Sequence, residues 1–145
     1  IIDSYQLPVS QFQFEVTETT ATQYTADLNL CIAKLQQAGI ALCLDDFGSG
    51  YANLGSILRL PFSVVKLDRS LLLNIRKEQK SRDFYENMVH TLKKIGYTIV
   101  AEGVENKEEA AYMEQWGVDM IQGYYYASPQ PPTELLLFLH SWNQK

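Results

Sequence analysis

Apolar residues recur along the chain in short runs that predict five strands separated by helices. Phe12, Phe14 and Val16 alternate with polar residues, and this period of two predicts a strand over 12–16. The run from Ile40 to Leu44 is apolar throughout, which is typical of a strand buried on both faces of a parallel sheet. Similar short runs predict the remaining strands over 64–67, 98–101 and 120–125.

Apolar residues at helical spacing predict what lies between these strands. A helix over 22–38 is followed by Gly39 and a helix over 81–95 by Gly96, because glycine readily adopts the left-handed conformation that ends helices. Asn106 is a preferred N-cap for a helix that ends near Gly117. Shorter patterns predict helices over 54–60 and 133–142, and a loop over 45–53. The expected apolar faces comprise Leu28, Cys31, Ile32 and Leu35 in the first helix, and Phe84, Met88, Leu92 and Ile95 in the second.

Five strand–helix units in succession predict a parallel α/β architecture. The 145 residues, 46% of them hydrophobic, are enough for one globular unit with a core. The net charge of −5 argues against a basic surface that binds a nucleic acid polymer. It leaves a phosphate ligand open if metal ions neutralise the site locally.

The sequence features that bear on cellular location and on the redox state of the cysteines both indicate a reducing compartment. The longest apolar run, Leu135 to Leu139, is far shorter than the roughly 20 residues of a membrane-spanning helix, and no secretory signal pattern opens the sequence. Cys31 and Cys43 fall on an apolar helix face and within a strand. We therefore expect reduced core thiols, with a disulfide or metal pair as the less favoured alternative. The expected location is cytoplasmic, either as a free protein or as the cytoplasmic part of a membrane-anchored one.

Acidic side chains end three of the strand-like runs, and a lysine ends a fourth. The carboxyl ends of parallel strands meet at one rim, where ligands of β/α folds bind. Carboxylates that converge there with a lysine suggest divalent metal ions holding a phosphorylated substrate. The residues concerned are Glu15 and Glu18, Asp45 and Asp46, Glu102 and Glu105, and Lys66.

Each of these residues also has an ordinary structural interpretation. A glutamate at a strand end, such as Glu15, is usually solvated, and a single aspartate at position 45 or 46 suffices for an Asx turn. Lys66 can extend its ammonium group past the strand end into water. Glu102 and Glu105 are favoured beside the positive N-terminal end of a following helix. Considered one at a time, the residues leave both interpretations open.

Five short motifs in a fixed order carry a more specific resemblance. They are Glu15-Val16-Thr17-Glu18, Asp45-Asp46-Phe47-Gly48-Ser49-Gly50-Tyr51, Lys66-Leu67-Asp68, Ala101-Glu102-Gly103-Val104-Glu105 and Gln122-Gly123-Tyr124. Together they resemble the EAL-domain family, the cyclic di-GMP phosphodiesterases of bacterial second-messenger signalling. The resemblance implies a TIM-type (β/α) barrel, of which residues 1–145 correspond to about the last five βα units. The strand with the Glu-Ala-Leu signature and the strand with a metal-binding asparagine are then expected upstream.

The resemblance implies metal-dependent hydrolysis of cyclic di-GMP to linear pGpG, with two Mg²⁺ or Mn²⁺ ions. Lys66 would position the attacking water, Glu102 would orient it or act as base, and Asp68 would pair with Lys66 or support the second metal. The implied metal ligands are Glu15, Asp45, Asp46 and Glu102. The implied catalytic residues are Lys66 and Glu102, the substrate contacts are Gln122 and Asp68, and the loop supports are Glu18 and Glu105.

Two other functions stay open at this point. One is an EAL module that binds cyclic di-GMP or a protein without catalysis, and the other is a different metal-dependent βα-barrel enzyme. All expected carboxylates of this part of the domain are present, which favours the enzyme. The isolated chain lacks two of the implied metal ligands and three βα units of a closed barrel, so we expect it to be inactive. Five parallel strands without closure leave two open edges and an exposed apolar inner face, so we expect a homodimer or larger assembly. Upstream GGDEF or sensor domains fit the same family.

Overall fold

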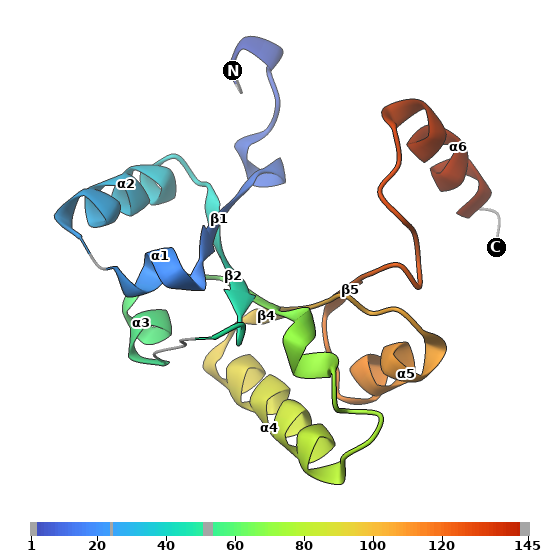
Figure 1. The fold of residues 1–145 in the computed structure, drawn as a ribbon. Helices are drawn as coiled ribbons and strands as arrows, with labels where there is room; N and C mark the ends of the chain where they lie inside the picture. The colour runs from blue at the N-terminus through green and yellow to red at the C-terminus, as the bar shows by residue number, and fades with distance from the viewer. Residues whose placement is uncertain (1–2, 24, 51–53, 143–145) are drawn as a thin grey trace.

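The computed structural model describes residues 3–23, 25–50 and 54–142. Its centre is one five-stranded parallel sheet in which the strands follow each other in chain order (Figure 1). The parallel α/β architecture is therefore confirmed, with an open sheet. The strands are β1 Gln13–Thr17, β2 Ala41–Phe47, β3 Val64–Leu67, β4 Thr98–Glu102 and β5 Met120–Gln122.

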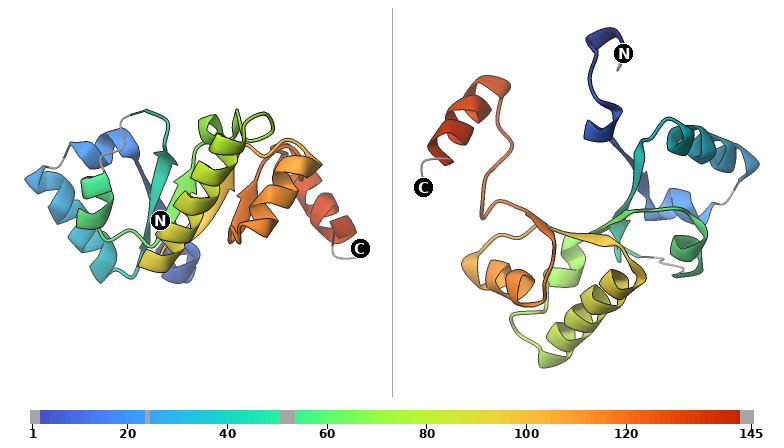
Figure 2. Two further views of the ribbon diagram at one scale, coloured as in Figure 1. Left: turned by 90° about the horizontal axis from the view of Figure 1, so that it is seen from below. Right: turned by 180° about the vertical axis from the view of Figure 1, so that it is seen from behind.

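Helices cover one face of this curved sheet and leave its concave face open (Figure 1). The helix α6 stands apart from the sheet in Figure 1 and in the right view of Figure 2, and none of its residues is buried. No described helix combines the length and apolar character that crossing a membrane requires. The helices are α1 Glu18–Thr22, α2 Ala26–Gln37, α3 Leu54–Arg59, α4 Gln79–Ile95, α5 Lys107–Gln115 and α6 Pro132–Trp142, with 3-10 turns η1 Asp3–Tyr5, η2 Val9–Gln11 and η3 Arg69–Leu72.

The two faces of the sheet carry different residues, because side chains alternate along a strand. One set of alternate residues packs into the main core under the helices, for example Leu42 and Leu44 of β2. The other set forms a small separate cluster of Cys43, Val64 and Val100 on the inner face. These three are buried, so the expectation of an exposed apolar inner face is wrong for them, whereas Met120 is 45% exposed. Cys43 is a core thiol as expected, and burial raises its pKa to about 12.

The segment predicted as one helix over 22–38 is two helices. Thr17 caps α1, and Thr25 caps α2 by accepting a hydrogen bond from the Leu28 amide at 3.2 Å. Starting at Thr25, α2 buries Ile32, with Leu28 and Leu35 half-buried beside it. Cys31 lies one position away from Ile32 and is exposed, so its assignment to the core is wrong.

The apolar face predicted for α4 is correct for Leu92, which is buried, and for Met88, which packs against the core, but wrong for the other two residues. The buried residues are Tyr85, Val89 and Leu92, while Phe84 is 61% and Ile95 is 51% exposed. The Tyr85 ring packs against Trp116 with 5.4 Å between ring centroids, and this aromatic contact fixes which side of the helix faces the core. Gly96 follows the last residue of α4 as predicted, with a φ of 106°, and Asn106 is the predicted N-cap of α5, accepting a hydrogen bond from the Glu109 amide at 3.0 Å.

Two strand boundaries differ from the prediction by more than one residue. β2 continues through Asp45 and Asp46 to Phe47, where a loop had been predicted from residue 45. The loop residues 51–53 lie outside the described part of the chain. β5 ends at Gln122, because the amides of Tyr125 and Tyr126 turn back to the carbonyls of Val104 and Gly123.

Candidate active site

Three carboxylates converge where β2 and β4 end. Asp45, Asp46 and Glu102 each place one carboxylate oxygen within 4.8 Å of the others. Asp46 has a φ of 58°, and the pairing of β2 with β3 shifts register between Leu44 and Phe47. In a regular strand, successive side chains point to opposite faces, but such a bulge re-aims one of them. The irregularity thus lets two adjacent aspartates reach the same cluster.

Lys66 of β3 lies at the centre of the acidic groups. Its Nζ is 2.7 Å from Asp45 Oδ1, 2.8 Å from Glu102 Oε1 and 3.1 Å from Glu15 Oε1, and its side chain is only 12% exposed. Burial disfavours the ammonium ion, but the hydrogen bonds to the three carboxylates outweigh it and raise the pKa of Lys66 above its usual value. Lys66 is therefore a fixed positive charge that joins β1, β2 and β4.

The surroundings of Glu102 and Asp46 disfavour the ionised form of their carboxyl groups. Burial raises the pKa of Glu102 despite its hydrogen bond from Lys66. Burial, and then the charges of Asp45 and Asp68, raise the pKa of Asp46. A divalent cation relieves this repulsion, and Mg²⁺ and Mn²⁺ prefer oxygen ligands of this type. The donor set of the cluster therefore fits a divalent metal ion.

Glu15 reaches the site from β1 by a different contact. It forms the ion pair with Lys66, and its side chain is 50% exposed. It lies outside the group of three carboxylates that are within 4.8 Å of one another. Of the four residues predicted as metal ligands, the structure thus brings three together and holds Glu15 beside them through Lys66.

Glu18, the first residue of α1, is buried at 4% exposure. Its Oε2 accepts a hydrogen bond from the Gly48 amide at 2.9 Å. This contact attaches the backbone just after Asp46 and Phe47 to α1. Glu18 therefore holds the start of the loop after β2 through its backbone at Gly48.

Asp68 does not pair with Lys66, contrary to one of the expectations for it. Its carboxylate instead accepts from the Ser70 amide at 2.9 Å and caps η3, the geometry of an Asx turn. Glu105 pairs with Arg69 of η3, with 2.9 Å between Nη2 and Oε1. Sequence reasoning missed Arg69, although its position two residues after the end of β3 offered a signal.

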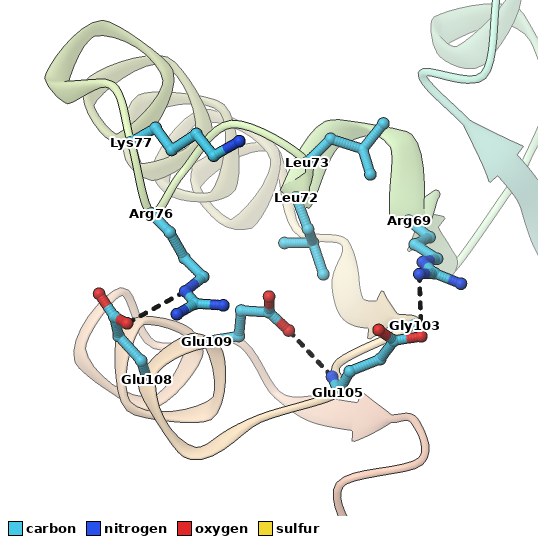
Figure 3. A pocket seen from close by; sticks show the side chains of 9 residues that line it. All are labelled: Arg69, Leu72, Leu73, Arg76, Lys77, Gly103, Glu105, Glu108 and Glu109. Carbon is cyan, nitrogen blue, oxygen red and sulfur yellow. Dashed lines mark hydrogen bonds and ion pairs between the residues drawn. The ribbon is translucent and has the colours of Figure 1, made fainter.

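Gln122 ends β5 and is exposed at the same rim. It lines a cavity of about 490 Å³ together with Arg69, Glu105 and Tyr124. A second cavity of about 440 Å³ shares Arg69, Gly103 and Glu105 with the first and extends toward α5 (Figure 3). Arg69 and Glu105 therefore line both cavities, and Gly103, which directly follows Glu102, lines them too.

Comparison with known proteins shows which family the chain resembles. The family model described as EAL domain matches residues 1–129. The cyclic di-GMP phosphodiesterase RocR of Pseudomonas aeruginosa is 32% identical over 136 residues, which are 94% of this chain and 35% of RocR. The cyclic di-GMP phosphodiesterase PdeL of Escherichia coli K12 is 34% identical over 131 residues, 90% of this chain and 35% of PdeL. The chain thus spans about a third of the length of these relatives.

The fold has counterparts among solved structures. The EAL enzyme Bd1971, in a form with cAMP and cyclic di-GMP bound, superimposes with a TM-score of 0.88 at 27% identity. The match covers 95% of this chain and 36% of Bd1971. The open five-stranded sheet therefore has the architecture of the corresponding part of an EAL barrel.

Proposed function

Because the chain belongs to the EAL-domain family, we propose that it is the C-terminal part of a domain that hydrolyses cyclic di-GMP to linear pGpG. One observation carries the proposal. Asp45, Asp46 and Glu102 converge beside the buried ammonium group of Lys66 at the rim where the strands end. The names of RocR and PdeL as cyclic di-GMP phosphodiesterases support the choice of substrate.

The carboxylates of Asp45, Asp46 and Glu102 would hold divalent cations, Mg²⁺ or Mn²⁺, with Glu15 in reach of the same region. Two such ions, when bound, polarise a phosphate group and lower the pKa of water. The remaining ligands would come from the preceding strands of the domain. In the described structure, Lys66 is the cation that pairs with the carboxylates of Glu15, Asp45 and Glu102. Bound metal ions would offset the negative charge of these carboxylates that one lysine leaves over.

The side chains around the cluster would orient the attacking water, offset charge on the phosphate and hold the neighbouring loops. Lys66 stays protonated, so it orients the water and offsets negative charge that develops on the phosphate. Glu102 has a raised pKa, which suits a proton acceptor or an orienting group at the attacking water. Glu18 would keep the loop after Asp46 in place, and Glu105 would do the same for the loop after Glu102.

The substrate would bind along the rim beside the cluster. Gln122 would contact the nucleotide from the cavity of about 490 Å³, where the exposed ring of Tyr124 offers a stacking surface for guanine. Asp68 uses one oxygen for the Ser70 amide, and its second oxygen would be free to contact substrate. A cyclic dinucleotide is a cytoplasmic messenger, so a cytoplasmic location follows from the proposal.

The proposal is tested with the full-length protein, by separating cyclic di-GMP from pGpG on a column after incubation. We expect pGpG in Mg²⁺ or Mn²⁺ and none after EDTA, with recovery when the metal is restored. Binding of cyclic di-GMP without pGpG under all metal conditions would instead establish the non-catalytic module. Absence of both binding and turnover would refute the proposal.

A further inference from the structure

The turn η3 lies between the loops that follow β2 and β4, the two strands that supply the candidate cation site. On one side, the Asp68 amide, which precedes η3, donates to the Phe47 carbonyl at 3.0 Å, and Ser70 Oγ donates to the Gly48 carbonyl at 3.4 Å. On the other side, Arg69 pairs with Glu105 (Figure 3). None of the four residues of η3 belongs to the carboxylate cluster. The turn therefore contacts both loops without supplying a ligand.

Two glycines allow η3 to pack directly on the backbone of these loops. Gly48 has a φ of 94°, and a Cβ there would lie 2.5 Å from Leu71 Cδ1. Gly103 has a φ of 69°, and a Cβ there would lie 2.6 Å from both Cβ and Cγ of Arg69. A larger residue at either position would therefore force the side chain of Leu71 or Arg69 to move. The aliphatic part of Arg69 thus rests on the residue that follows Glu102.

The loop after Glu102 is also held by its own backbone. The Val104 amide donates to the Gln122 carbonyl at 3.2 Å, and the Glu105 amide donates to Glu109 Oε2 at 2.9 Å. Glu105 then directs its carboxylate to Arg69, so one arginine contacts both the second and the fourth residue of the segment 102–105. This segment begins with Glu102, the last residue of β4, whose carboxylate lies 2.8 Å from Lys66.

We propose that Arg69 is a positioning residue for the cation site. Through Gly103 and Glu105 it fixes the loop that aims Glu102 at Asp45 and Asp46. This inference rests on the proposed function, because it assumes that the cluster binds divalent cations. Outer contacts of this kind orient metal ligands, and losing one typically weakens metal binding about 10- to 100-fold.

The same cavity offers a matched control. Arg76 pairs with Glu108 at 3.1 Å, and the exposed fractions of the two side chains are 54% and 50%, against 55% and 42% for Arg69 and Glu105 (Figure 3). Glu108 lies in the first turn of α5, beyond the loop that follows Glu102. Replacing Arg76 therefore removes a similar ion pair without loosening Glu102.

The test measures the Mn²⁺ dissociation constant of the full-length protein by electron paramagnetic resonance of free Mn²⁺, together with the thermal midpoint. We expect R69A, R69E and E105R each to weaken Mn²⁺ binding about tenfold. The double variant R69E/E105R restores the ion pair with reversed charges, and its affinity should return toward the wild-type value. R76A should bind Mn²⁺ as the wild type does.

Wild-type Mn²⁺ affinity in R69A, an equal loss in R76A, or no recovery in the double variant would each overturn the role of Arg69. A lower thermal midpoint with unchanged Mn²⁺ affinity would show a purely structural contact and would also overturn it. If the wild-type protein itself binds no Mn²⁺, the proposed function fails, and this inference fails with it. The two failures are thus distinguished by the wild-type measurement.

Discussion

Asp45 takes part in both interactions that define the site. One of its carboxylate oxygens belongs to the cluster with Asp46 and Glu102, and its Oδ1 accepts from Lys66 at 2.7 Å. We expect D45N in the full-length protein to lower pGpG production by roughly 100-fold or more, because losing a ligand costs at least as much as losing an outer partner. The fold should persist, since Lys66 keeps Glu15 and Glu102 as partners.

The experiment compares D45N with D27N, which changes an exposed aspartate in the first turn of α2. Turnover in Mn²⁺ and the circular dichroism spectrum are measured for both. Near wild-type turnover by D45N would remove Asp45 from the mechanism. An unfolded D45N would show that its role is structural.

Individual residues differ in how far the sequence alone predicts them. The rim position of Asp45 and Glu102 follows from apolar strands that end in acidic residues. The shared direction of Asp45 and Asp46 does not follow, because it depends on a register shift and a positive φ that contradict the strand period. The pairing of Arg69 with Glu105 joins residues from different strand ends, and only the fold brings them together.

Among the elements, α4 and the strands beside it are connected through Asp119. Its Oδ2 accepts from the Ile99 amide at 2.8 Å and its Oδ1 from Lys93 of α4 at 2.7 Å, while Lys93 also donates to the Gly117 carbonyl. Burial opposes ionisation of Asp119, but the hydrogen bonds from Lys93 and Ile99 outweigh it and hold its pKa below the ordinary value. Asp119 therefore stabilises the folded chain in its ionised form.

We expect D119N to lower the free energy of unfolding at pH 7 by roughly 1 kcal/mol, a value reduced for the partial exposure of the pair. A folded-state pKa below the unfolded one contributes stability that is present above the unfolded pKa and is lost as pH falls through the folded pKa. The difference between D119N and wild type should therefore shrink below about pH 4. Denaturant unfolding at pH 7 and pH 3 checks this, with the exposed D83N as control; a constant difference would contradict it.

The contact between α4 and α5 contains a buried hydroxyl group. Tyr85 is fully buried, and its Oη finds no hydrogen-bond partner among the described residues. Burial also raises the pKa of Tyr85, so the phenol stays neutral. A buried polar group without a partner costs roughly 1–3 kcal/mol, and the ring contact with Trp116 does not need the hydroxyl.

We therefore expect Y85F to raise the free energy of unfolding by about 1 kcal/mol. Y85L, which removes the ring and its contact with Trp116, should lower it. Thermal and urea unfolding of both variants provide the measurement. Destabilisation by Y85F would mean that the hydroxyl has a partner that stabilises the fold.

Element types were predictable because strand and helix periods are local, whereas helix rotation was not. The sequence places Phe84 and Tyr85 side by side, and both can face a core. In the structure Tyr85 faces the core, where Trp116, 31 positions later in the sequence, packs against it. Similarly, Thr25 was part of an apparently continuous helix, but its hydroxyl caps α2 and divides the segment in two.

At the scale of the whole molecule, the sheet is open at both ends. Among the described strands, β1 pairs only with β2, and β5 pairs only with β4. Apolar side chains remain exposed near both edges, including Phe14 at 48% and Met120 at 45%. The helix α6 adds Leu136 at 61% and Leu137 at 72% exposure. Unpaired strand edges and apolar surface of this kind favour association.

We therefore expect the 145-residue chain, produced alone, to form a homodimer or larger assembly and to produce no pGpG. Association covers the strand edges and the leucines of α6, while the ligands expected from the preceding strands are missing from the cation site. Sedimentation equilibrium measures the assembly, and the pGpG assay in Mn²⁺ measures activity, with the full-length protein as the positive control for turnover. A well-folded monomer at all concentrations would contradict the first expectation, and metal-dependent pGpG production by the isolated chain would contradict the second.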